Sequence, residues 1–138
     1  MTAQPLYTTA ILRLAASLAE PRALTRQDGR AEVRSPTCGS RIATAVQLED
    51  GRVTALSQEV HACAFGQAAA ALVERGAVGR SAEEIESASA GLCAWLTGQV
   101  PEPPWDMADL APARSRKGRH GAIMLPFRAL LAAIEAAR

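Results

Sequence analysis

The chain has 138 residues, and its 15 basic side chains nearly balance 14 acidic ones, so the formal net charge is only +1. A dedicated nucleic-acid-binding domain usually has a strongly basic face. Aromatic residues, at 4%, are also too scarce to build base-stacking platforms. Three cysteines are too few, and odd in number, for a disulfide framework, which indicates a reducing compartment. Composition therefore excludes a disulfide-rich secreted scaffold and argues against a nucleic-acid partner.

The length predicts a single domain over residues 1–138, because domains cluster near about 100–150 residues. The first 20 residues lack the basic start of a signal peptide, and Arg13 interrupts their apolar stretch. No uninterrupted apolar run reaches the roughly 18 residues of a membrane span, because Arg128 and Glu135 break the C-terminal stretch. We therefore expect a cytoplasmic protein without a membrane partner.

The first half of the chain predicts one helix and a small antiparallel sheet. Apolar residues recur on one helical face over residues 5–20, and Pro21 ends that pattern. Three strands are predicted at residues 31–35, 41–49 and 52–60. Asp50-Gly51 is a typical two-residue hairpin turn between the last two strands.

The second half predicts helices. Residues 63–75 form a helix that Gly76 ends, and a capping box at Ser81–Glu84 opens a helix that runs to Leu96. A proline-rich loop and the basic cluster RSRKGRH follow, and a last helix spans residues 121–138, beginning near Pro126. The predicted class is α+β, with a three-stranded antiparallel sheet covered by helices.

Two cysteines stand where the local structure changes. Cys38 lies in SPTCGS, where Pro36 stiffens the backbone and Gly39 permits a tight turn between strands. Cys63 lies in HACAFG, where a strand passes into a helix, and the positive end of a helix dipole favours a thiolate. Because the intervening hairpin returns the chain to its start, we expect the two sulfurs within about 4–7 Å, as ligands of one metal.

The alternative for any free cysteine is a buried, unreactive position in the core. We predict that position for Cys93, which stands in GLCAWL within a helix. His61 precedes Cys63 by two residues, so in an extended backbone the two side chains share a face. That arrangement suits either a metal ligand or a proton partner for the thiolate, but a structural hydrogen bond is the common role of such a histidine.

Three motifs, in this order, resemble those of the IscU/NifU-like iron–sulfur cluster assembly scaffolds. SPTCGS resembles the family's first cysteine motif, HACAFGQAAAALV its second, and RSRKGRHGAIMLPFRALLAAI its last. The similarity covers nearly the whole chain. It implies the order of elements found in that family, a helix followed by a β-hairpin and further helices. It also implies thiolate ligands at Cys38 and Cys63.

The chain departs from the family pattern at the remaining ligands. Ala122 stands where the third cysteine is expected, and His120 lies two residues before it as a substitute nitrogen ligand or a solvent-facing side chain. Ser40 replaces the aspartate that the family uses as a metal ligand. The family's hydrophobic-proline chaperone motif is replaced by APARSRKG, so no chaperone partner is carried over.

The resemblance implies a non-enzymatic scaffold or carrier that binds iron or a labile iron–sulfur cluster. Its partners would be a cysteine desulfurase and apo iron–sulfur recipient proteins. Two alternatives stay open: a zinc-bound sulfur acceptor of the SufU type, and an interaction module that kept the fold and lost the cluster. The basic cluster around Lys117 is either a solvated loop or a docking patch for an acidic partner such as the desulfurase.

Overall fold

The computed structural model describes residues 7–36 and 39–138. Its strands form an antiparallel sheet in the order β1-β2-β3. The predicted α+β class, with a three-stranded antiparallel sheet and helices packed on it, is confirmed. In chain order the elements are α1 (Thr9–Ala16), β1 (Gly29–Arg34), β2 (Arg41–Glu49), β3 (Arg52–His61), α2 (Ala64–Ala77), α3 (Ala82–Leu96), the short 3-10 helix η1 (Ala108–Ala113) and α4 (Lys117–Ala136).

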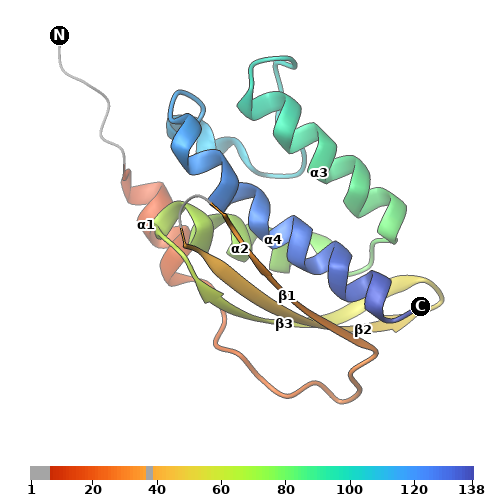
Figure 1. Ribbon diagram of the computed structural model, residues 1–138. Helices are drawn as coiled ribbons and strands as arrows, with labels where there is room; N and C mark the ends of the chain where they lie inside the picture. Colours follow the sequence, from red (N-terminus) through yellow and green to blue (C-terminus); the bar gives the residue numbers. More distant parts are fainter. Residues whose placement is uncertain (1–6, 37–38) are drawn as a thin grey trace, which may run out of the picture.

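The helices gather on one face of the sheet (Figure 1). Helix α4 packs across β1 and β2, and α2 packs beside it against β3. Helix α1 covers α2, while α3 packs on the side of α4 that faces away from the sheet. The apolar residues of the sheet are therefore buried on one face only, as expected of an antiparallel sheet.

The β2–β3 hairpin forms as its turn residues predict. Asp50 and Gly51 both have positive φ, 52° and 75°, which is the backbone of a two-residue type I′ turn. Strand β2 has the predicted bounds, and β3 extends one residue further, to His61. The hairpin brings the start of β2 back to the end of β3, where Arg41 pairs with His61.

Alanine allows α2 to pack closely at the centre of the molecule. The four residues 68–71 are all alanine and all fully buried, between larger core side chains such as Phe65 and Val73. A helix buried on nearly every side needs small side chains to approach its neighbours. The short core side chains also explain why so few aromatic residues suffice for this core.

Helix α2 does not end at Gly76, as the sequence predicts, but continues to Ala77. The left-handed position that closes the turn is Gly79, with φ 90°. Gly76 instead makes room for an aromatic ring: a Cβ on it would stand 2.3 Å from Cε3 of Trp105. Glycine is therefore needed at position 76 so that Trp105 can pack against the helix, and the sequence alone does not show this contact.

Helix α4 begins before the predicted start, at Lys117, so part of the basic cluster is helical. Pro126 lies inside the helix and is buried, not at its start as predicted. Because proline has no N–H, only the carbonyl of Ala122 loses its usual i+4 donor. Burial of the apolar side chains around Pro126 outweighs that local loss.

The first helix and strand also differ in length from the prediction. Helix α1 is shorter, because the Thr8 side chain caps its start by accepting from the Ile11 amide, and the Ser17 hydroxyl donates to the Leu14 carbonyl at its end. Strand β1 begins two residues early, at Gly29, where a Cβ would clash with the carbonyl of Ala133. That glycine lets β1 approach the end of α4.

Within the described ranges, no helix combines the length and the apolar character that crossing a bilayer requires.

Candidate functional site

The described residues on either side of Cys38 lie at the same end of the sheet as the segment that carries Cys63. Strands β1 and β2 are joined there by a turn, closed by a hydrogen bond from the Ser35 amide to the Ser40 carbonyl (2.8 Å). Arg41 begins β2 directly after that turn and pairs with His61, the last residue of β3. The chain then passes through Ala62 into α2. The register therefore brings the β1–β2 turn beside the β3–α2 junction.

Cys38 lies outside the described residues, so its predicted distance to Cys63 stays a prediction. The residue after it, Gly39, has φ 72°, and a Cβ there would meet nothing within 4 Å. The glycine is required by the backbone of the turn and not by crowding. Ser40 is buried, with 6% of its surface exposed, and is engaged with neighbouring residues.

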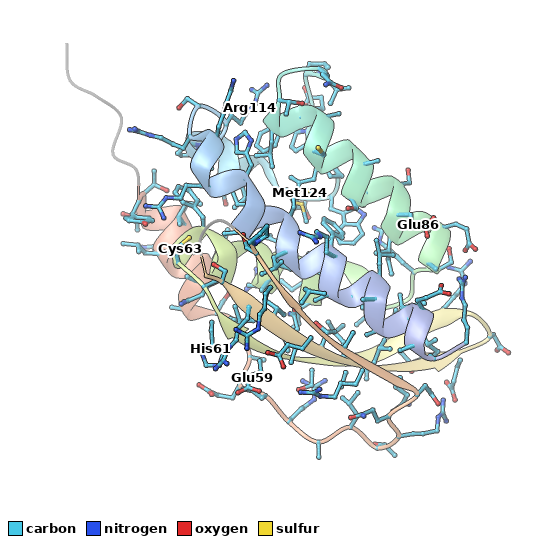
Figure 2. The ribbon with its side chains drawn as sticks, in the orientation of Figure 1. Glu59, His61, Cys63, Glu86, Arg114 and Met124 are labelled. Carbon is cyan, nitrogen blue, oxygen red and sulfur yellow. The ribbon has the colours of Figure 1, made fainter. Side chains whose placement is uncertain are left out.

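Cys63 is the N-cap residue of α2, with extended backbone angles (φ −66°, ψ 173°). Its side chain makes no capping hydrogen bond, is partly exposed, and packs against the edge of the core. In Figure 2 its sulfur lies beside the first turn of α2. The free N–H groups of a helix start favour negative charge, so this position suits a thiolate ligand or nucleophile.

The turn that positions Cys63 is held by Gln67, one helical turn later. The Gln67 side chain donates to the Ala62 carbonyl (3.0 Å), and its backbone amide donates to the Cys63 carbonyl (2.9 Å). Gly66 lies on the same turn, and a Cβ there would stand 2.6 Å from the Ala62 Cβ. Sequence reasoning passed over both residues, although their spacing of three and four from Cys63 marks one turn of helix.

His61 is paired with Glu59. Its Nε2 lies 3.4 Å from Glu59 Oε1, and both side chains are about half exposed. The two residues border a small hollow with Glu32 and Arg41. Figure 2 shows His61 and Glu59 below the sheet, on the opposite side from the helices. The predicted ligand His61 therefore stands in sequence beside Cys63, but its side chain pairs with a carboxylate.

Ala122 faces the start of α2. It is buried, and its Cβ would stand 3.5 Å from a Cβ on Gly66. The position at which the family resemblance implies a third cysteine thus lies against Gly66, in the helical turn that follows Cys63. The preceding residue, Gly121, is partly exposed. Alanine at 122 therefore packs in the contact between α4 and the first turn of α2.

His120 is directed to another part of α4. Its Nε2 lies 2.9 Å from the carbonyl oxygen of Ala113 and 3.2 Å from that of Arg114. Carbonyl oxygens only accept, so Nε2 carries the proton and donates. Positions two residues apart are separated by about 200° around a helix, so His120 and Ala122 lie on opposite sides of α4. His120 lines a cavity at the end of α3 with Leu96 and Thr97.

The predicted metal residues do not form one cluster in the described ranges. Across residues 7–36 and 39–138, no group of three or more His, Cys, Asp or Glu side chains is arranged to hold a metal ion. The structure brings Cys63 and the end of β3 to the β1–β2 turn. It does not add His120 to them.

The prediction that Cys93 is buried in the core is wrong. Cys93 is exposed on α3. The helix buries the face that carries Ile85, Ala88 and Leu92, and one residue beyond Leu92 the chain has turned about 100° toward solvent. Apolar neighbours in sequence misled the prediction, since helical phase decides burial.

The chain resembles solved structures over nearly its full length. A nitrogen-fixing NifU-like protein (N-terminal) from Brucella abortus superposes with a TM-score of 0.88 and 32% identity, covering 96% of this chain and 94% of that chain. A putative iron–sulfur cluster assembly scaffold protein for the SUF system, from Fervidobacterium islandicum AW-1, superposes with a TM-score of 0.84, covering 94% and 96% of the two chains. Its identity is 14%, so this second likeness shows the fold alone.

No family model and no curated protein matches the chain. The resemblance first suggested by three short motifs therefore rests on the superposed structures. An identity of 32% over almost all of both chains shows that this protein belongs to the family of NifU-like N-terminal domains.

Proposed function

We propose that this protein is an iron–sulfur cluster assembly scaffold or carrier, which holds iron or a labile cluster through the thiolates of Cys38 and Cys63. The observation that carries the proposal is the position of Cys63, partly exposed at the start of a long helix, at the end of the sheet where the β1–β2 turn lies. Membership of the NifU-like family supports it. Soft thiolate ligands suit iron–sulfur clusters and zinc.

The remaining ligands are few, and this suits a carrier. An incomplete, partly exposed coordination shell holds a cluster less tightly, so the cluster can be passed on. His61 precedes Cys63 by two residues, and its side chain is about half exposed, so it would be free to exchange Glu59 for a metal. His120 has its Nε2 proton engaged by two carbonyls and is turned toward α3, so we do not include it in the ligand set. Ser40 is buried and engaged.

The proposal implies two kinds of partner. A cysteine desulfurase would supply sulfur to the thiolates, and apo iron–sulfur proteins would accept the cluster. The protein itself would carry its cargo without catalysing a reaction on a small-molecule substrate. The reducing compartment that its free cysteines indicate, such as the cytoplasm, is where such thiolates stay reduced.

A second candidate is an interaction module that kept the fold without the cluster. The observation that favours it is that Ala122 and Ser40 stand where the family pattern has a third cysteine and an aspartate. A zinc-bound sulfur acceptor is a third outcome, which would need the same two thiolates with zinc in place of iron.

Anaerobic reconstitution with ferrous iron, cysteine and a cysteine desulfurase separates these functions. For a scaffold we expect a visible absorption band that is lost in Cys38→Ser and in Cys63→Ser. Cys93→Ser is the matched control, because Cys93 is exposed on a different helix, and it should leave the band unchanged. A band that survives both substitutions, or no band with any preparation, would overturn the scaffold proposal.

Metal analysis of the purified protein completes the experiment. Zinc at about one equivalent, lost with either thiol, would identify the sulfur acceptor instead. No metal and no cluster under any condition would leave the interaction module.

A further inference from the structure

A cavity of about 620 Å³ lies between the end of α3 and the start of α4. Its lining is largely apolar, and it opens among basic side chains. The residues that line it are Leu96, Thr97, Gly98, Arg114, Ser115, Lys117 and His120. It lies on the side of α4 that carries His120, away from the Ala122 side that packs on Gly66 of α2. None of its residues is needed for the proposed scaffold function.

Positive charge is concentrated at this cavity although the chain as a whole is nearly neutral. Residues 1–109 carry nine basic and thirteen acidic side chains, whereas residues 110–138 carry six basic ones and a single acid, Glu135. Between Asp109 and Glu135 there is no acidic residue at all. The surface field around the start of α4 is therefore positive and attracts anionic partners.

This charge has no internal compensation in the described part of the protein. Arg114, Arg116, Lys117 and Arg119 take part in none of its ion pairs. The first turn of α4 holds no acidic residue, and its N-cap, Arg116, provides no capping bond. Cations at a helix start also interact unfavourably with the positive end of the helix dipole. A bound anionic partner would reduce both this interaction and the repulsion among the unpaired basic side chains.

The side chain of Arg114 is fixed in one orientation by two contacts with Trp95. Its Nε donates to the Trp95 carbonyl (2.9 Å), and its guanidinium lies over the Trp95 ring, 5.0 Å from the centroid. Its terminal NH₂ groups have no hydrogen-bond partner among the residues described. A guanidinium fixed in this way offers a carboxylate two parallel donors without first losing side-chain freedom.

The apolar lining distinguishes between anionic partners. Leu96 lines the cavity and is 3% exposed, so the base of the cavity is part of the apolar core. An apolar side chain that enters the cavity would contact this core residue. Trp95, the aromatic residue beside the cavity, is buried and covered by Arg114, so it offers no surface on which a nucleic-acid base would stack. Apolar and acidic groups together are the chemistry of a protein segment.

We propose that this cavity docks an acidic peptide segment of a partner protein, in which an apolar side chain enters between α3 and α4 and flanking carboxylates meet Arg114 and Lys117. Binding of this segment recruits the partner protein, and it leaves the thiol site on the other side of α4 uncovered. The docking does not depend on the proposed scaffold function.

Fluorescence anisotropy with the full-length protein tests the docking. The probe is a fluorescein-labelled peptide of about ten residues, with one central leucine between acidic residues. We expect saturable binding that weakens with salt and falls about tenfold or more in the Arg114→Glu, Lys117→Glu double variant. Arg128→Glu is the control for a single charge reversal, since Arg128 is exposed on the same helix about three turns away, and the affinity of this variant should stay within about twofold of the native protein's.

Further arms decide the class of partner. Replacing the central leucine by serine should weaken binding, and equal binding would show that the cavity takes no part. Equal losses in the double variant and in Arg128→Glu would overturn a defined site. Tighter binding to anionic phospholipid vesicles or to a single-stranded oligonucleotide of similar charge would overturn the assignment to a peptide. Circular dichroism of each variant confirms its fold.

The peptide and the thiol site can be tested separately. The Cys63→Ser variant should bind the probe as the native protein does. Loss of cluster reconstitution with intact peptide binding would therefore refute only the scaffold function. If the native protein forms a cluster but does not bind the peptide, only the docking site is refuted.

Discussion

Gly66, in the first turn of α2, lies against Ala122 of α4, and Cβ atoms at the two positions would be 3.5 Å apart. This contact joins the helix that follows Cys63 to the helix that, in the family pattern, carries a third cysteine. The start of α2 is therefore fixed by a close helix–helix approach that small residues permit. The position of Cys63 depends on that approach.

Enlarging Gly66 should disturb the start of α2. A Cβ there would stand 2.6 Å from the Ala62 Cβ, so Gly66→Leu forces a backbone shift. We expect a loss of about 1–3 kcal/mol in the free energy of unfolding, measured by urea denaturation. Gly118→Ala is the control, because a Cβ there meets nothing and alanine favours the helix; it should stabilise by about 0.5–1 kcal/mol. Equal effects of the two changes would contradict the packing described.

A cysteine supplied by α4 should strengthen metal binding. Ala122 is buried against Gly66, whereas Gly121 is partly exposed, so a thiol at 121 stands nearer the surface than one at 122. We expect Gly121→Cys to raise the yield and lifetime of a reconstituted cluster. Ala122→Cys should gain less and lose stability. Visible absorption after reconstitution measures the first effect and urea denaturation the second; no gain in either variant would show that α4 does not reach the cluster.

Replacing Gly76 should destabilise the protein. The Trp105 ring, over which Arg80 stacks at 4.9 Å, packs on Gly76 and contacts Phe127 at a centroid distance of 5.2 Å. Because the ring is held on several sides, Gly76→Ala should cost about 1–3 kcal/mol of stability despite alanine's helix propensity. Urea denaturation followed by tryptophan fluorescence provides the measurement. A stabilising effect, as for an ordinary glycine within a helix, would contradict the contact.

Stability should fall in acid partly through Glu84. The Ser81 backbone amide and the Arg52 side chain donate to its carboxylate, and these hydrogen bonds lower the pKa of Glu84 from its ordinary 4.5. A pKa lowered in the folded state contributes stability above the unfolded value, which is lost as the pH falls through the folded value. Glu84→Gln should therefore reduce the loss of stability as the pH drops below 4.5.

Urea denaturation at a series of pH values measures this effect. Asp28 keeps part of the acid sensitivity in the variant, because the hydrogen bonds from Arg26 and from the Leu48 amide also lower its pKa. Glu86→Gln, on the same helix, is the control, since Glu86 takes part in no ion pair of the described chain; Figure 2 shows it pointing to solvent. An unchanged pH profile in Glu84→Gln would refute the assignment.

Much of the fold is predictable from the sequence because its signals are local. The Asp50-Gly51 turn and the capping box at Ser81 are fixed by the backbone preferences of a few neighbouring residues, and both formed as predicted. The alternation of residues 41–49 likewise set the bounds of β2. Family membership also followed from short motifs, since their order along the chain is a property of the sequence.

Tertiary structure decided what contacts across the fold control. Gly76 reads as a helix end, but it is kept inside α2 by the ring of Trp105, which lies 29 residues later. Cys93 reads as core, but the packing of α3 on α4 set the helical phase that exposes it. His120 reads as a neighbour of the Ala122 position, yet the two diverge around α4. The sequence by itself determined the elements and the residue types available for chemistry, and only the packing of helices on the sheet decided which side chains face one another.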